Sequence, residues 1–281
     1  MEFIKNYKSN DALRLSFDTL AKNTFGISFE AWYQDGCWND RYIPYSFEDQ
    51  GRIIANASAN KMTLIIEGQE VQAIQIGTVM TDPEYRRRGL AYELIQKIIN
   101  DFDESVSLYY LAADVEAMSL YNRCGFSEVT AVRYSWQNPL KSTVKLEKIH
   151  LSLEELIKAK KNSVLKGSKF EVVDDEHILS FYYHHGFKDK IYRMDDEILI
   201  IADILEGEQG IEIYDVFSKS KFSLNDLVDK TGARMVNFNF DVAGMIIGLE
   251  KIEIKNSGWM IRSHKGMVLK YPLAYPKLAQ A

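Results

Sequence analysis

The chain has 281 residues and a formal net charge of −6, with 46% hydrophobic and 26% charged residues. This composition is typical of a globular protein, and the length allows one large domain or two ordinary ones. The acidic balance disfavours nucleic acid as a partner, because phosphate backbones need clustered cations. We expect a cytoplasmic protein with no membrane partner, since the sequence contains neither a long apolar run nor an apolar signal core.

The first 80 residues predict a helix followed by three strands. Apolar side chains recur at helical spacing over residues 11–25, and Gly26 follows as a stop signal. An aromatic-rich segment comes next, at residues 29–42. Turn sequences then separate three extended runs, which predict an antiparallel meander, at residues 42–47, 52–66 and 71–80.

The stretch TDPEYRRRGLAYELI, residues 81–95, places three arginines and a glycine between the third strand and an amphipathic helix. The first N–H groups of a helix have no intrahelical partner and carry the positive end of the helix dipole. A glycine lets a ligand approach the backbone, and arginine side chains suit phosphate oxygens. The pattern predicts a cradle for a diphosphate group at residues 86–91.

A buried strand at residues 107–113 and a short helix at 115–126 complete this part, with alternating strand character after them. The segment 138–150 is polar and basic and has no clear period. We therefore predict a domain boundary there, between a domain at 1–140 and a domain at 141–281.

The second half repeats the order of elements in the first half. Ser152 and Glu155 have the spacing of a capping box at the start of a helix. Two long strands, 196–206 and 210–218, precede a helix from Ser223 and a further strand. No glycine or arginine occupies the position where a cradle would lie.

Two segments resemble the GCN5-related N-acetyltransferase (GNAT) superfamily. TVMTDPEYRRRGLAYELI is similar to its acetyl-CoA-binding core, and AMSLYNRCGF at 117–126 is similar to its Tyr-x-x-x-Gly-Phe segment. The resemblance covers residues 1–137 and implies an α+β fold, an α/β sandwich whose mixed, mostly antiparallel sheet is flanked by helices. The second half resembles a degenerate, smaller GNAT-like domain, as in two-domain members of the superfamily.

The resemblance implies acetyl-CoA as cosubstrate and direct attack by a primary amine in a ternary complex. Tyr121 would protonate the leaving thiolate, a role that suits a phenol. Asp114 departs from the family, which often has asparagine there, so its contact with the pantetheine arm is open. The cofactor-binding residues would be Val79, Met80 and Thr81 for that arm and Arg86, Arg87, Arg88, Gly89, Leu90 and Ala91 for the pyrophosphate.

The general base is not evident from the sequence. The first half has no histidine, and Gln72 and Gln75 occupy the strand where some family members carry glutamate. In the enhanced-intracellular-survival type of the superfamily, the C-terminal carboxylate enters the active site. The tail YPLAYPKLAQA, ending at Ala281, is therefore a candidate for the catalytic base.

The aromatic-rich segment predicts a pocket for a cationic acceptor. Its residues Trp32, Asp35, Trp38 and Asp40 would supply cation–π contacts and negative charge. An ordinary edge of the core is the alternative, because aromatic residues mostly serve packing.

Other features leave the function partly open. The two cysteines predict free thiols, and the adjacent pair His184 and His185 is not expected to bind a metal. The acceptor is an unspecified small-molecule or peptide amine, and a homo-oligomer is compatible with the sequence. A non-catalytic acyl-CoA-binding sensor is the alternative to an N-acetyltransferase, and a structural protein that binds no CoA is a third reading.

Overall fold

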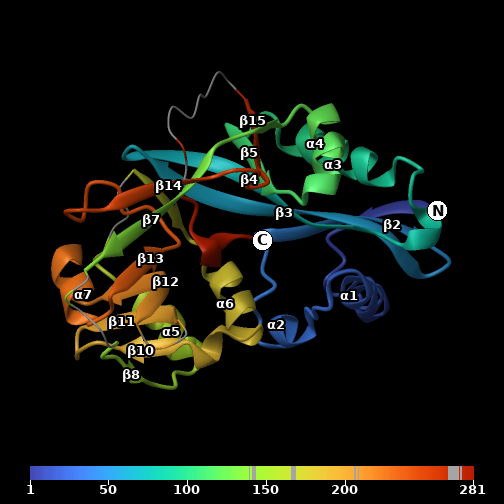
Figure 1. The fold of residues 1–281 in the computed structure, drawn as a ribbon. Helices are drawn as coiled ribbons and strands as arrows, with labels where there is room; N and C mark the ends of the chain where they lie inside the picture. The colour runs from blue at the N-terminus through green and yellow to red at the C-terminus, as the bar shows by residue number, and fades with distance from the viewer. Residues whose placement is uncertain are drawn as a thin grey trace.

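The computed structural model describes residues 1–138, 140, 144–165, 169–205, 207, 209–264, 272 and 274–281. They form two sheets with helices packed against them (Figure 1). The predicted α+β class, with mixed and mostly antiparallel sheets, is confirmed. None of the described helices is long and apolar enough to cross a membrane.

The first sheet has eight strands in the order β1-β2-β3-β4-β5-β15-β6, with β9 also paired to β3. The meander predicted from the sequence is present as β2, β3 and β4. Parallel pairing occurs only between β4 and β5 among the described strands of this sheet. The strands are β1 (Glu2–Lys5), β2 (Tyr42–Asp49), β3 (Arg52–Ile66), β4 (Gln69–Thr81), β5 (Leu108–Ala112), β6 (Ser127–Glu128), β9 (Phe170–Val173) and β15 (Trp259–Ser263).

Helices cover both faces of the first sheet. The helices α3 (Leu90–Phe102) and α4 (Met118–Arg123) lie on one face, and α1 (Asp11–Phe25), α2 (Glu30–Gln34) and α6 (Glu176–His184) lie on the other (Figure 1). The apolar side of α3 packs on the sheet because its buried residues recur at helical spacing. Short 3-10 turns connect these elements at η1 (Pro83–Tyr85) and η2 (Val115–Ala117).

The predicted ends of α1 are confirmed by its caps. The side chain of Asn10 accepts a hydrogen bond from the Leu13 N–H at the start of the helix. Gly26 ends the helix with φ of 71°, a left-handed conformation that glycine adopts at little cost.

The second sheet has seven strands in the order β14-β7-β13-β12-β11-β10-β8. The capping box predicted for α5 is present, since Ser152 and Glu155 bond to each other's backbone N–H. The elements are β7 (Ala131–Gln137), β8 (Glu147–Lys148), α5 (Leu153–Lys161), η3 (Phe187–Asp189), β10 (Ile191–Arg193), β11 (Ile198–Ile204), β12 (Gly210–Ser218), α7 (Leu224–Lys230), β13 (Met235–Phe238), β14 (Glu250–Ile254) and η5 (Lys277–Ala279).

The two sheets exchange strands across the predicted boundary at residue 140. Strand β7 comes from the first half of the chain and pairs with β13 and β14 in the second sheet. Strands β9 and β15 come from the second half and pair with β3 and β5 in the first sheet. Residues 141–143 lie outside the described residues, so the boundary stays a prediction, but each sheet needs strands from both sides of it.

Helix α6 and the end of the chain join the two halves. The indole Nε1 of Trp32 in α2 donates a hydrogen bond to the His177 carbonyl of α6 (2.7 Å). The hydroxyls of Tyr110 in β5 and Tyr275 share a buried hydrogen bond (2.6 Å). The end of the chain therefore lies against the first sheet, beside α6 (Figure 1).

Candidate active site

Strand β4 carries a bulge that separates it from β5. Between Gly77 and Met80 the pairing with β3 shifts, so that Thr78 and Val79 face a single residue of β3. The φ of Thr78 is 49°, which is unusual for a β-branched residue. Pairing with β5 ends at Gln75, so the two strands diverge beyond it. The bulge thus opens a gap between β4 and β5.

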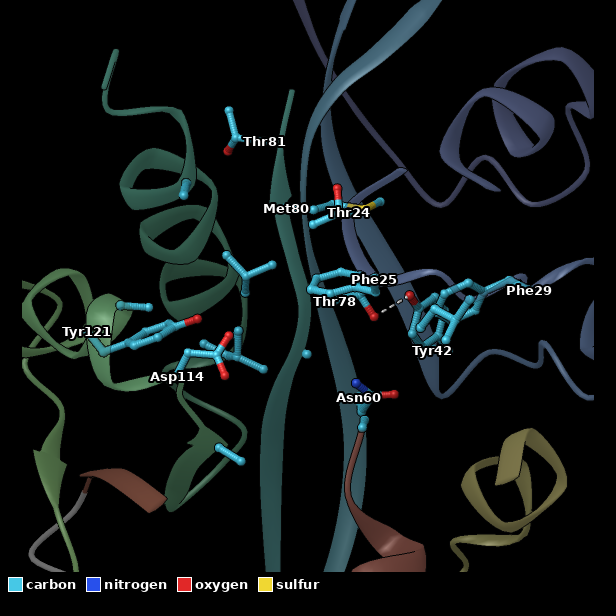
Figure 2. A pocket seen from close by; sticks show the side chains of 18 of the residues that line it. Thr24, Phe25, Phe29, Tyr42, Asn60, Thr78, Met80, Thr81, Asp114 and Tyr121 are labelled. Carbon is cyan, nitrogen blue, oxygen red and sulfur yellow. Dashed lines mark hydrogen bonds between the residues drawn. The ribbon is translucent and has the colours of Figure 1, made fainter. Parts of the chain in front are cut away.

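Side chains from β2 and β3 hold the bulge in place. The hydroxyl of Tyr42 donates to Thr78 Oγ1 (3.0 Å; Figure 2) and accepts from Ser58 Oγ (2.9 Å). Asn56 Nδ2 donates to the Thr78 carbonyl (2.8 Å). Because these groups are buried, their mutual hydrogen bonds avoid the cost of unpaired polar atoms.

The edge of β4 beyond the bulge offers backbone groups to the gap. The N–H of Asp82 donates toward β3 (2.8 Å). Backbone groups alternate between the two edges of a strand, so those of Met80 also face β3. The backbone groups of Val79 and Thr81 then face the gap, and Arg86 Nε donates to the Thr81 carbonyl from that side (3.2 Å). Such an edge suits an extended amide-containing ligand.

The turn after β4 leaves the start of α3 without a side-chain cap. Gly89 is the N-cap residue, with φ of 82°, and a Cβ at this position would meet no atom within 4 Å. The N–H of Glu93 bonds to the Gly89 carbonyl (3.0 Å). The helical N–H groups before Glu93 have no intrahelical acceptor and carry the positive end of the helix dipole. This turn is open to an anion.

The three arginines divide into two groups. Arg86 and Arg87 line the cavity at the turn. Arg88 turns back, donates to the Glu84 carbonyl (2.8 Å) and lies over the Tyr85 ring. Within the described part of the chain, none of the three arginines forms an ion pair with a carboxylate. The predicted cofactor residues that line the cavity are Val79, Met80, Thr81, Arg86, Arg87 and Ala91.

The remaining predicted cofactor residues have other positions. Leu90 is buried in the core beneath α3. The structure therefore gives its side chain, and that of Arg88, no place on the cavity wall.

Tyr121 lies on the far wall of the gap. Its side chain is buried and lines the cavity beside Asp114, opposite Phe29 and Tyr42 (Figure 2). Burial, and then the nearby Asp114 carboxylate, raise the pKa of the Tyr121 phenol well above its ordinary value. The phenol is therefore protonated at neutral pH and able to donate a proton.

Strand β15 supports the helix that carries Tyr121. The side chain of Arg262 donates from Nη1 to the Cys124 carbonyl at the end of α4 (3.1 Å). A residue of the second half thus helps to hold the wall of the gap.

The cavity, of about 690 Å³, continues past the bulge to a second region. We call this region the aromatic lobe and define it by Phe25, Phe29, Trp32, Tyr42 and Phe181, which all line the cavity. The rings of Phe29 and Phe181 lie 4.9 Å apart, and those of Trp32 and Tyr42 lie 5.2 Å apart, edge to face. The lobe is a packed aromatic wall formed by both halves of the chain.

Only one of the four predicted acceptor residues lines the cavity. Trp32 does, whereas Trp38 packs behind it in the core. Asp40 is 90% exposed and pairs with Lys8. Asp35 lies 3.0 Å from His184 Nε2, away from the cavity lining. The expectation that Asp35 and Asp40 grip a cation here is corrected, because both carboxylates point to the surface.

The end of the chain reaches the cavity. Residues 271 and 273 of the predicted tail lie outside the described residues, but Ala281 lines the cavity. Its carbonyl carbon would lie 3.0 Å from a Cβ placed on Gly77, so the glycine makes room for it. Tyr182 donates to the Gln280 carbonyl (2.9 Å) and holds the tail in place.

One lining residue was not expected from the sequence. His177 of α6 lines the cavity, and burial lowers the pKa of its imidazole to about 3. No local pattern marks this residue, because its position follows from the packing of α6 against α2. In the part of the chain that the structure describes, no group of three or more histidine, cysteine, aspartate or glutamate residues could hold a metal ion.

Comparisons with known proteins agree with this architecture. Residues 12–129 match the family model of the acetyltransferase (GNAT) domain. No curated protein matches the chain by sequence. Among solved structures, Eis1 from Mycobacterium abscessus has a TM-score of 0.61 and 13% identity, with 94% of this chain and 74% of that chain covered.

Two further solved structures are similar over most of the chain. A GCN5-related N-acetyltransferase from Kribbella flavida has a TM-score of 0.57 and 16% identity, covering 93% of this chain and 71% of that chain. Another, from Anabaena variabilis, has a TM-score of 0.59 and 16% identity, covering 92% and 72%. At these identities the structures show the shared fold, and the family model identifies the domain. Residues 12–129 thus match the acetyltransferase (GNAT) domain, and the rest of the chain shares its fold with the solved structures.

Proposed function

We propose that the protein transfers an acetyl group from acetyl-CoA to a primary amine by direct attack in a ternary complex. The observation that carries the proposal is the gap at the Thr78 bulge. This gap connects an open helix start, a phenol on the opposite wall and a separate aromatic lobe. Cosubstrate and acceptor can therefore meet from two directions, and proximity supplies much of the rate.

The residues present fit acetyl-CoA. The edge of β4 at Val79 and Thr81 suits the amides of the pantetheine arm, and Met80 adds an apolar contact. The open turn at Gly89, with Arg86 and Arg87 on the cavity wall, suits a pyrophosphate. When bound, acetyl-CoA supplies an acyl group activated as a thioester.

The chain's own groups supply the proton transfers. Tyr121 is the proposed acid, because its protonated phenol lines the gap that would hold the thioester sulfur. A backbone N–H at the bulge is the proposed donor to the thioester oxygen. The bulge lies between the gap and the aromatic lobe. An amine bound in the lobe would therefore lie close to the thioester and be oriented for attack.

The carboxylate of Ala281 is the proposed acceptor of the amine proton. It lies on Gly77 at the junction of the gap and the aromatic lobe. His177 is a weaker candidate, since an imidazole with a pKa of about 3 accepts protons poorly. Removing residues 279–281 should abolish turnover and leave acetyl-CoA binding intact.

A gentler change tests the same role, because Ala279 is buried and its loss disturbs packing. One glycine added after Ala281 displaces the carboxylate without removing any residue. Wild-type turnover in the extended protein would rule out the carboxylate as the base.

A non-catalytic acyl-CoA sensor is the second candidate. It is favoured by the position of Asp35 and Asp40, which leaves the aromatic lobe without the predicted acidic side chains. An amine screen with acetyl-CoA separates the two, since a sensor binds the cosubstrate but releases no CoA.

Thermal unfolding with added acetyl-CoA tests the proposed cosubstrate directly. Ligand at 100 times its dissociation constant stabilises the native state by about 2.7 kcal/mol. The midpoint should then rise by roughly 2–4 °C per kcal/mol. Gly89→Glu should remove the shift, because a carboxylate there repels the pyrophosphate.

Gly68→Glu is the matched control. Gly68 also has positive φ and open surroundings, but it lies in the turn between β3 and β4, away from the cavity. A shift that survives Gly89→Glu, or no shift in the wild type at saturating ligand, would contradict the proposed function.

A further inference from the structure

The aromatic lobe contains little negative charge. Among the described residues that line the cavity, side-chain carboxylates come only from Asp114 and Glu116. Both belong to the segment beside Tyr121, and Figure 2 shows Asp114 on that side, opposite Phe29. Apart from the Ala281 carboxylate at the edge of the lobe, a ligand with several positive charges would therefore lose hydration here without gaining partners. The lobe suits an apolar body instead.

Two buried polar side chains, Asn60 and His177, break this apolar lining, and Gln75 is the ladder partner of Asn60 on β4. Asn60 and Gln75 are fully buried, and His177 is 3% exposed. Asn60 Oδ1, both terminal atoms of Gln75 and both ring nitrogens of His177 have no hydrogen-bond partner among the described residues. Buried polar atoms nearly always have a partner, so this group calls for one from outside the chain. We call Asn60, Gln75 and His177 the polar floor.

The polar floor lies beside the reacting position. Asn60 and Gln75 are direct partners across the β3–β4 ladder, so their side chains lie on the same face of the sheet. Gly77 follows two residues along β4 and presents the same face, on which Ala281 lies. Asn60, His177 and Ala281 all line the cavity. A molecule in the aromatic lobe can thus reach the floor and the bulge together.

The polar floor is uncharged. Asn60 and Gln75 are amides, and His177 is neutral because burial, and then the nearby Arg41, lower the pKa of its imidazole to about 3. These side chains offer both donors and acceptors. They match a neutral amide or hydroxyl group better than a carboxylate or an ammonium group.

We infer that the acceptor is a small primary monoamine with an apolar body and one uncharged hydrogen-bonding group, which the polar floor recognises. This inference rests on the proposed acetyl transfer and names its acceptor class. It excludes polyamines and other polycations as good acceptors.

A panel of amines with matched bodies tests the inference. Phenylalaninamide and leucinamide carry the neutral group, phenethylamine and isoamylamine lack it, and phenylalanine and leucine replace it with a carboxylate. Spermidine adds positive charge. The kcat/KM of the amides should exceed that of every other class by at least about tenfold. Equal or better use of spermidine or of the amino acids would overturn the inference.

A tripeptide amide beginning with phenylalanine distinguishes a small acceptor from a polypeptide N-terminus. If the kcat/KM of this tripeptide amide exceeds that of phenylalaninamide tenfold, the acceptor is a polypeptide and the inference is wrong. Calorimetric binding of the same amines to the CoA-saturated protein must give the same ranking. No binding by any of them would also overturn the inference.

The variant His177→Phe tests the polar floor itself. It removes two unpartnered nitrogens at similar size, so the preference for amides over the matched simple amines should fall by about tenfold. His184→Phe, on the same helix but paired with Asp35 away from the cavity, should keep the wild-type preference.

Gln75→Met is a second variant, in case His177→Phe does not fold. It has similar length and should reduce the same preference. A preference unchanged in both variants would overturn the role of the floor. Failure of acetyl-CoA to stabilise the wild-type protein would instead overturn the proposed function, so the two failures remain distinguishable.

Discussion

The units β4–α3–β5 and β12–α7–β13 have the same local topology in the two sheets. In each, a strand leads into a helix and then into a parallel neighbour. In each, the first strand carries an irregularity, at Thr78 in β4 and at Tyr214 in β12. The elements and their connections therefore do not by themselves distinguish a ligand site from a structural unit.

The two units differ in which backbone groups remain available. The start of α7 is capped by the Ser223 side chain, which accepts from the Asn225 N–H (3.2 Å), whereas Gly89 leaves α3 uncapped. Near the end of β13, Lys277 N–H donates to the Asn239 carbonyl (2.9 Å), so the chain's own tail occupies that place. The comparison teaches that unpaired backbone groups, rather than topology, prepare the first unit for a ligand.

The largest expected effect is on turnover, and it compares Tyr121 beside the first unit with Tyr214 in the second unit. Tyr121→Phe should lower turnover by about 10²- to 10⁴-fold, because it removes the proposed acid. Tyr214→Phe removes a phenol of the second unit, which bonds to Asp203, and should leave turnover unchanged. CoA release with a competent amine measures both. Full turnover by Tyr121→Phe would show that the acid lies elsewhere.

The second prediction concerns the ion pairs that join the second unit, through Asp215 of β12, to α5 and the start of α6. The side chain of Lys160 is 18% exposed and lies 2.9 Å from the buried Asp175 and 3.4 Å from Asp215. Burial lowers its pKa, but the two carboxylates outweigh this effect and raise it. Lys160→Met leaves both carboxylates unpaired and should reduce the free energy of unfolding by about 3–5 kcal/mol in urea titrations.

The matched control is Lys190→Met, whose partner Asp203 is partly exposed. Solvent weakens this pair, so the loss should stay below about 1 kcal/mol. Similar losses of unfolding free energy in the two variants would mean that the ion pairs of Lys160 with Asp175 and Asp215 do not stabilise the second unit.

The third prediction follows from His177 at the junction of the two halves. The unfolded chain protonates this residue near pH 6.5, but the folded chain does so only near pH 3. Between these values the unfolded state binds more protons, so stability falls as the pH falls. The midpoint of His177→Gln should decline less between pH 6.5 and 4 than that of the wild type. Parallel declines would show that His177 titrates normally.

The smallest effect tests the cap of α7. Ser223→Ala should lower the free energy of unfolding by about 1 kcal/mol, because the Asn225 N–H loses its acceptor. Acetyl-CoA binding should be unchanged. A loss of binding would mean that the second unit contributes to the cosubstrate site after all.

Local signals explain why much of the site could be predicted. The helical spacing of α3, the glycine before it and the segment around Tyr121 each lie within one short stretch of chain. The strands of the meander follow from alternation and turn residues in the same way. These features need no knowledge of distant contacts.

The features that could not be predicted depend on which strands pair and which distant segments pack together. A pattern of apolar residues can mark a segment such as β15 as extended but not the strand beside it, so its insertion between β5 and β6 does not follow from the sequence. The carboxylates of Asp35 and Asp40 lie in the right segment but point to the surface. His177 reaches the cavity only through packing between the halves.

The insertion of β15 into the first sheet has a consequence for biosynthesis. A ribosome makes β5 long before β15, which begins at Trp259 and pairs on its outer edge. During that interval the nascent chain carries an unprotected strand edge, which can pair with other chains. The usual order, in which an N-terminal domain folds while the next is translated, does not apply here. The first sheet is completed only when most of the polypeptide has been synthesised.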